Sequence, residues 1–302
     1  PRVAGLGVVQ LAALVATSLA SALTPGSITA LNYGWRVMQL PETLIATAIA
    51  TAAFPTLSEY AARGQLAELR ATLSSTLRAI LLLTIPATIA LLILGRPLVQ
   101  ILFERGRFTS AATDLVTFAL QGYAIGLIGQ STLEVCARSF YAQQDTYTPL
   151  YVALGAMAIN ITFSFLLKDV LGVGGLALAN SIGASVEVLG LVIILRRRWQ
   201  GVDGRRLARS ILKFAAGSIG LTLAALIVQS IFSSTPLRFD SINNETLKSI
   251  LELGIPLVAT VLTGLTAYVI TIGLLRSEEL GGLRRSLGRR SAIHLNEISS
   301  SD

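Results

Sequence analysis

The chain has 302 residues, of which 53% are hydrophobic and only 14% are charged, and its mean hydropathy is +0.68. This composition excludes an ordinary soluble domain and predicts a membrane protein with several spans. The formal net charge is +7 at pH 7. The arginines lie between and after the apolar runs rather than on a soluble face, which argues against nucleic-acid binding and for a membrane topology signal.

Runs of about 20 apolar residues predict eight membrane spans along the chain. They cover residues 4–23, 27–57, 77–94, 112–140, 149–167, 172–195, 207–232 and 247–275. The connections are short and carry turn residues, and the longest early one is the polar stretch 58–73. The expected fold is therefore an all-α, polytopic membrane helix bundle. Residues 97–103 follow Gly95 and Arg96 and predict a short interfacial helix before the next loop.

The basic residues divide unequally between the two sides of the predicted membrane. The side that holds the three arginines at 196–198 also holds most other basic residues, including those of the tail. The opposite side has only Arg96, Arg105, Arg107, Lys168, Arg238 and Lys248. The positive-inside rule places the richer side in the cytoplasm, together with both ends of the chain. The polar tail 276–302 is expected to be a solvated, basic terminus attracted to anionic lipid.

The start of the chain, its single cysteine and its single histidine give no sign of a catalytic or metal site. It opens at Pro1, without an initiator methionine or a signal peptide, so we expect an N-terminally truncated piece of a longer protein. The single cysteine, Cys136, is expected to be a small buried residue. The sole histidine, His294, has no second ligand nearby, and no metal site is expected.

One polar stripe interrupts the second predicted span. Thr29, Asn32, Tyr33, Arg36 and Gln39 recur at helical spacing and therefore share one helix face. A charge inside a membrane span costs at least about 2.5 kcal/mol, so the arginine should face a polar cavity or a partner. The hypothesis for function is an anion-binding arginine in an aqueous cavity. The alternatives are a snorkelling arginine or one paired to a carboxylate on a neighbouring helix.

Three further spans carry polar residues at helical spacing. These are Tyr123, Gln130 and Glu134 in the fourth span, Asn160 and Ser164 in the fifth, and Asn180 and Glu187 in the sixth. Together they suggest an internal pathway or ion site, but such residues also hydrogen-bond between membrane helices simply to hold them together. Glu134 is expected to pair with Arg138, one turn later. Glu187 has either a functional role or an ion-pair partner.

No motif for an enzyme is present in the sequence. There is no Gly-x-Ser-x-Gly, no His-Glu-x-x-His, and no phosphate-binding glycine loop followed by Lys and Ser or Thr. The pair Gly174–Gly175 is better explained by close helix packing, and Gly281–Gly282 by a helix end. We therefore expect no catalytic residue and no cofactor.

Five motifs occur in a fixed order along the first two thirds of the chain. They read SITALNYGWR with QLP at 27–41, FPTLS at 54–58, FERGRFT at 103–109, FYA with DTYTP at 140–149, and GVGGLALA at 172–179. In these motifs the chain resembles the C-terminal portion, helices seven to fourteen, of the lipid II flippase family MurJ, also called MviN. That family belongs to the multidrug/oligosaccharidyl-lipid/polysaccharide (MOP) exporter superfamily.

The resemblance implies a division of the chain into three parts. Residues 1–198 would form the C-terminal six-helix lobe, 199–275 two extra transmembrane helices that make a groove for a lipid tail, and 276–302 the cytoplasmic tail. The complete protein would have a second, N-terminal lobe, absent from this chain, facing the first in a V. The expected location is the bacterial inner membrane.

The resemblance also implies a substrate and a mechanism. The substrate would be undecaprenyl diphosphate bearing the peptidoglycan disaccharide-pentapeptide, moved from the cytoplasmic to the outer leaflet by alternating access. Arg36 stands where the family has a cavity arginine, and a guanidinium suits a diphosphate. Tyr33, Asn32, Thr29 and Gln39 would line the same substrate site.

The chain departs from the family at several positions. Trp35 replaces an acidic residue that often precedes the cavity arginine, and Glu134 stands where a base is common. The positions that match a sodium site in some members are Ala16, Asn160, Ser164 and Asn180. Because Ala16 and Ser164 lack carboxylates, sodium coupling is not favoured.

Two alternatives to a lipid II flippase follow from the same residues. One is a related transporter, either a flippase for another lipid-linked oligosaccharide or a cation-coupled drug exporter. The other is a membrane scaffold without transport activity, which predicts that Arg36 is buried and ion-paired.

Overall fold

The computed structural model describes residues 2–199, 201, 204–234 and 245–275. In these residues the structure is helical and has no strand. The elements are α1 (Arg2–Ser21), α2 (Ser27–Pro41), the π-helix η1 (Glu42–Thr47), α3 (Ala48–Ala62), α4 (Leu66–Phe103), α5 (Ser110–Ala142), α6 (Tyr147–Arg198), α7 (Gly204–Ser234) and α8 (Glu245–Leu274). Six helical stretches of this part of the chain are long and apolar enough to cross a membrane, so the protein is a multi-pass membrane protein.

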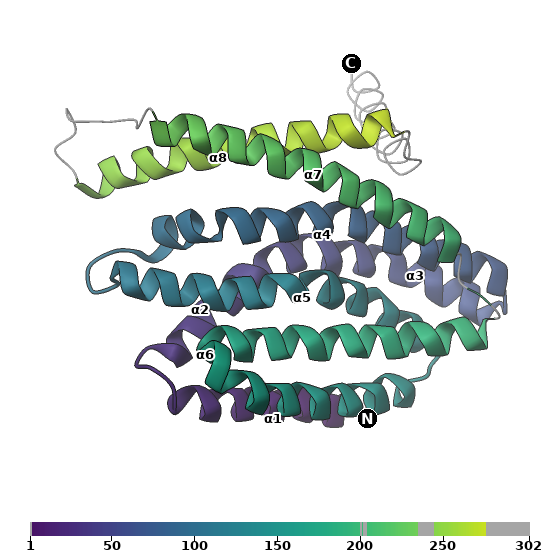
Figure 1. The fold of residues 1–302 in the computed structure, drawn as a ribbon. Coiled ribbons are helices and arrows are strands. Elements are labelled where there is room, and N and C mark those ends of the chain that lie inside the picture. Colours follow the sequence, from purple (N-terminus) through teal and green to yellow (C-terminus); the bar gives the residue numbers. More distant parts are fainter. Residues whose placement is uncertain (1, 200, 202–203, 235–244, 276–302) are drawn as a thin grey trace, which may run out of the picture.

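The longest helix, α6, is a hairpin of two spans. Gly172 has φ 51° and ψ −129°, a conformation that only glycine adopts readily, and the chain reverses there (Figure 1). Close approaches between the two halves show that they run antiparallel, since Gly183 lies against Asn160 and Gly190 against Val152. With α1 and the two halves of α6, the helical segments correspond to the eight predicted spans.

The second span is continuous but irregular. The segments α2, η1 and α3 follow one another without a break from Ser27 to Ala62. Pro41, at the end of α2, has no N–H to donate to the carbonyl four residues earlier, and the π-helical segment begins directly after it. The irregularity therefore lies in the middle of the span that carries Arg36.

Helix α4 extends further at both ends than the sequence predicts. It starts at Leu66, inside the stretch expected to be a polar connection, and it continues through Pro97 to Phe103. The prediction of a separate interfacial helix at 97–103 is therefore wrong. A proline inside a membrane helix removes one hydrogen bond without ending the helix, because the remaining backbone bonds and the neighbouring helices hold it.

Helix α5 lies at the centre of the bundle (Figure 1). The second half of α6 approaches it through small residues, since a Cβ atom on Gly122 would lie 2.7 Å from the Gly174 carbonyl oxygen. Ser181 donates a 2.7 Å hydrogen bond to the carbonyl of Gly122 across this interface. These contacts confirm the prediction that Gly174 serves close packing. The GxxxG spacing of Gly122 and Gly126 is a signal in the sequence that could have located this interface.

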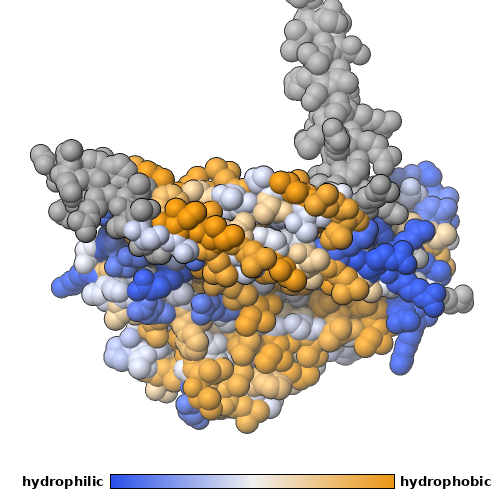
Figure 2. All heavy atoms as spheres, turned by 45° about the horizontal axis from the view of Figure 1, so that its top comes forward, coloured by the Kyte–Doolittle hydropathy of each residue, from blue (hydrophilic) through white to orange (hydrophobic). Residues whose placement is uncertain are grey.

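Helices α7 and α8 form a pair that packs on α4 (Figure 1). Buried side chains of all three helices meet in one cluster: Leu81, Leu82, Ile85, Phe214, Leu221, Tyr268 and Ile272. Figure 2 shows hydrophobic surface in the middle of the molecule and hydrophilic surface towards its two ends, as expected for a bundle within a bilayer. The predicted basic tail at 276–302 lies outside the described residues.

Candidate functional site

The polar stripe of α2 forms an open face of the helix. Thr29, Asn32, Arg36 and Gln39 are all exposed, as the helical spacing predicts. The opposite face is buried against α5, where a Cβ atom on Gly34 would lie 3.0 Å from the backbone nitrogen of residue 120. The stripe therefore points away from the interior of this bundle.

Arg36 has no ion pair with any carboxylate of the described residues. Within the described part of the chain Arg36 is thus exposed and unpaired, whereas the scaffold hypothesis predicts a buried and ion-paired arginine. Trp35, which precedes Arg36, packs edge-on against Tyr123 with ring centroids 5.2 Å apart. Because the guanidinium is always charged and offers five donors, Arg36 can bind an anion from this face.

Two other residues of the stripe make local contacts. The Asn32 side-chain amide donates a 2.9 Å hydrogen bond to the carbonyl of Ile28 on its own helix. The half-buried ring of Tyr33 stacks on Phe103, at the end of α4, with centroids 4.6 Å apart. Tyr33 thus links α2 to the turn that follows α4, a contact that helical spacing in one segment could not reveal.

The polar residues of α5 and α6 bond to one another, once between helices and once within a helix. The Gln130 amide donates to Asn180 Oδ1 at 3.3 Å, which joins α5 to the second half of α6. Within the first half of α6, the Ser164 hydroxyl donates to Asn160 Oδ1 at 3.2 Å. Both amide oxygens therefore already accept a hydrogen bond, and neither these residues nor Ala16 supplies a side-chain carboxylate.

The acidic residues of the membrane spans have different surroundings. Glu134 pairs with Arg138 at 2.5 Å, which confirms the predicted contact one turn apart. Glu42, at the start of η1, lies close enough to Glu134 for their charges to interact. The sequence offered no sign of this approach, because it depends on how η1 packs on α5. Among the described residues, Glu187 has no ion-pair partner.

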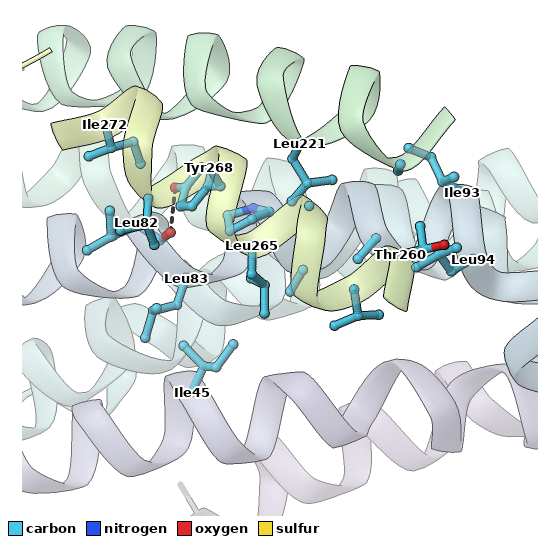
Figure 3. Close-up of a pocket in the computed structure, with 17 residues that line it drawn as sticks. Ile45, Leu82, Leu83, Ile93, Leu94, Leu221, Thr260, Leu265, Tyr268 and Ile272 are labelled. Atoms are coloured by element: carbon cyan, nitrogen blue, oxygen red, sulfur yellow. Dashed lines mark hydrogen bonds between the residues drawn. The ribbon is translucent and has the colours of Figure 1, made fainter. Parts of the chain in front are cut away.

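An apolar cavity of about 410 Å³ lies between η1, α4, α7 and α8 (Figure 3). Ile45 lines it from η1, Leu83 from α4, and Leu265 from α8. Its few polar groups include Tyr268, whose hydroxyl donates a 2.6 Å hydrogen bond to the carbonyl of Leu82. A cavity of this size and polarity suits a hydrocarbon chain. The family resemblance implied a groove made by the last two helices; the cavity seen here takes much of its wall from α4 and η1 as well.

Comparison with known proteins places the chain in a family. The family model of the lipid II flippase MurJ matches residues 1–245. The chain is 27% identical over 286 residues to a probable lipid II flippase MurJ of Bdellovibrio bacteriovorus, covering 95% of this chain and 52% of that protein. It is 33% identical over 198 residues to the lipid II flippase MurJ of Burkholderia cenocepacia, covering 66% of this chain and 38% of that protein.

A solved structure shares the fold. It is a lipid II flippase MurJ in an inward closed conformation, with a TM-score of 0.67 and 24% identity, and the match covers 90% of this chain and 52% of that one. The chain thus spans about half the length of the Bdellovibrio relative and of this solved structure. Because the family model covers most of the residues described above, including the arginine face of α2, the chain belongs to the lipid II flippase MurJ family.

Proposed function

We propose that this chain is the C-terminal part of a transporter that moves a lipid-linked peptidoglycan precursor, lipid II, to the outer leaflet. The single observation that carries the proposal is Arg36, which is exposed on a membrane helix and unpaired among the described residues. An uncompensated charge at that position is costly unless it meets water or an anion. The diphosphate of lipid II supplies such an anion, and a planar guanidinium binds it through two parallel hydrogen bonds.

The apolar cavity supports the same substrate. Ile45, on its wall, follows Arg36 by nine residues, which corresponds to about 14 Å along a helix. One continuous span, α2 to α3, therefore carries both the cationic face and one side of the cavity. A lipid with an anionic headgroup and a long hydrocarbon tail matches this pairing of features. In this proposal the headgroup contacts Arg36, while part of the tail occupies the cavity beside α7 and α8.

Transport requires a second half. The matched relatives are about twice as long as this chain, so we propose that an N-terminal lobe faces the open side of α2 and closes the cavity around the headgroup. Alternating access then follows from rocking of the two lobes about this site.

The distribution of basic residues favours an orientation with the α4–α5 turn outside the bacterial inner membrane and the C-terminus in the cytoplasm. The membrane potential supplies about 2.3 kcal/mol per charge moved per 100 mV, so in this proposal either a coupled cation or the potential itself drives transport.

Complementation tests the proposal. A full-length protein carrying this chain would be expressed in cells depleted of their own lipid II flippase, as the parent and as Arg36→Ala and Arg36→Lys variants. We expect the parent to restore growth, the alanine variant to fail, and the lysine variant to restore it partially, because lysine keeps the charge but loses the forked geometry. Membrane levels of each variant are measured in the same cells.

A matched control is Arg63→Ala, which removes the arginine that directly follows the same continuous span. Arg63 pairs with Glu59 at 2.7 Å on the surface, so its loss should leave growth unchanged. Rescue by Arg36→Ala would overturn the role of this arginine. If the parent inserts well but does not restore growth, the substrate is instead another lipid-linked oligosaccharide or an exported drug.

A further inference from the structure

The turn between α4 and α5 is attached to the middle of α2 by three aromatic rings. Tyr33 stacks on Phe103 and meets Phe108 edge-on, with centroids 4.6 Å and 6.0 Å apart. Phe103 and Phe108 are themselves 6.1 Å apart. The two phenylalanines stand on either side of the tip of the turn. Because Phe103 precedes the tip, Phe108 follows it and both rings contact Tyr33, the tip is held beside α2.

The tip carries two arginines. Gly106 has φ 59°, and the N–H of Phe108 donates to the carbonyl of Arg105 at 3.1 Å, which closes a tight turn around Arg105 and Arg107. Both arginine side chains are exposed. Arg105 donates one hydrogen bond to the carbonyl of Ile101 at the end of α4, which leaves most of its donors available.

The acidic residues of this region form their described contacts with other residues rather than with the arginines of the tip. Asp114 pairs with Arg96 at 2.8 Å, and Glu104 accepts a 2.6 Å hydrogen bond from Thr113. Within the described part of the chain, neither Arg105 nor Arg107 has an ion pair with a carboxylate. Uncompensated basic residues are disfavoured on the outer side of a membrane protein, so two of them on one turn need an explanation.

The tip is close to the polar face of α2. Tyr33 precedes Arg36 by three residues, or about 4.5 Å along the helix. Its stacking partner Phe103 precedes Arg105 by two residues. Arg36 and the two arginines of the tip therefore lie on two segments that the Tyr33 ring contacts bring together.

We propose that Arg105 and Arg107 form a second phosphate-binding site, which takes the diphosphate of the lipid substrate as it leaves Arg36 on the outer side. This proposal rests on the proposed function. The guanidinium groups supply forked hydrogen-bond donors for phosphate oxygens. The attachment through Tyr33 keeps the second site in a fixed place relative to the first. Anionic phospholipid headgroups offer the same chemistry, and the experiment separates the two sources.

The test measures binding of fluorescent undecaprenyl diphosphate, added from outside, to the full-length protein in phosphatidylcholine proteoliposomes. The variants are Arg105→Gln/Arg107→Gln, Arg36→Ala and, as a matched control, Arg96→Gln. Arg96 is a basic residue of the same region, but it is already paired with Asp114. We expect the double variant to bind about tenfold more weakly and the control to bind within twofold of the parent. Competition by inorganic pyrophosphate should be weaker in the double variant than in the parent.

Each other outcome has a defined meaning. If the double variant binds like the parent while Arg36→Ala is weakened, the second site is overturned and the proposed function stands. If neither changes binding, the proposed function fails as well. If the double variant differs from the parent only when phosphatidylglycerol is present, the turn binds bulk phospholipid and the inference is overturned. Equal melting temperatures of the variants, together with recovery of binding by Arg105→Lys/Arg107→Lys, would exclude misfolding as the cause.

Discussion

The hydroxyl of Tyr268 in α8 donates a 2.6 Å hydrogen bond to the backbone carbonyl of Leu82 in α4. In a regular helix this carbonyl would accept from the N–H of residue 86, but residue 86 is proline and has no N–H. Tyr268 thus satisfies a backbone group that Pro86 leaves without its helical donor. The bond lies at the wall of the apolar cavity and joins the last helix to the six-helix part of the bundle (Figure 3).

Replacing Tyr268 with phenylalanine should destabilise the protein by about 0.5–1.5 kcal/mol, because it leaves a buried carbonyl unsatisfied. The measurement is reversible unfolding of the purified protein in mixed micelles. The informative comparison is a double-mutant cycle with Pro86→Ala, which restores an N–H at residue 86. In the Pro86→Ala variant, removing the Tyr268 hydroxyl should lower the free energy of unfolding much less. An equal cost in both backgrounds would show that the hydroxyl does not compensate for the proline.

Introducing a methyl group at Gly126 should destabilise the α5–α6 interface by about 1–3 kcal/mol. A Cβ atom there would lie 2.7 Å from the Cα of Ser181, so the two backbones must separate. Gly155→Ala is the matched control, since it also lies within a membrane helix but its Cβ would have no atom within 4 Å. The control should be neutral or stabilising, by at most about 1 kcal/mol. Similar melting temperatures for the two variants would contradict the close packing.

Lowering the pH should weaken the connection between the two ends of the α6 hairpin. Arg198 donates to Asp145 Oδ2 at 2.5 Å, and Thr148 donates to the same carboxylate at 2.6 Å through its hydroxyl. Partial burial by itself would raise the pKa of Asp145, but these bonds and the Arg198 charge lower the pKa to about 2. Since the folded pKa lies below the usual value of about 3.9, the contribution is complete above pH 4 and is lost as the pH falls towards 2.

Melting temperatures of the parent and of Asp145→Asn between pH 6 and pH 2 test this contribution. The two proteins should differ at pH 6 and converge as the pH falls, because the parent loses its carboxylate. The difference at pH 6 should be about 1 kcal/mol or less, since Arg198 is partly exposed. A constant difference across the range would mean that the carboxylate does not contribute through its charge.

Filling the apolar cavity should lower transport of lipids with a long hydrocarbon tail. Ala90 lines the cavity, and a phenylalanine there would occupy part of its volume of about 410 Å³. In a proteoliposome assay, Ala90→Phe should lower transport of a lipid with a full-length tail several-fold and affect a short-tailed analogue less. Leu223→Phe, on the exposed surface of α7, is the control and should leave both rates unchanged. Equal loss for both lipids would indicate a packing defect instead of tail recognition.

Some features of this protein are determined by the sequence alone because they depend on local spacing. The apolar runs specify the spans, since a helix of about 20 apolar residues matches the bilayer thickness. The exposed face of α2 follows from the positions of Thr29, Asn32 and Arg36, and the pairing of Glu134 with Arg138 follows from a separation of one helical turn. The prediction of a separate interfacial helix at 97–103 was wrong, because neighbouring helices and the remaining backbone hydrogen bonds keep α4 helical through Pro97.

Only the tertiary structure decided how distant segments meet. Tyr268 and Leu82 are 186 residues apart, and the cavity beside them draws its wall from four elements. The stacking of Tyr33 on Phe103 and the approach of Glu42 to Glu134 likewise join different helices. Helical periodicity states which residues share a face, but not which face of another helix they will contact. That choice depends on how small residues, prolines and bulky side chains fit together when all the helices pack at once.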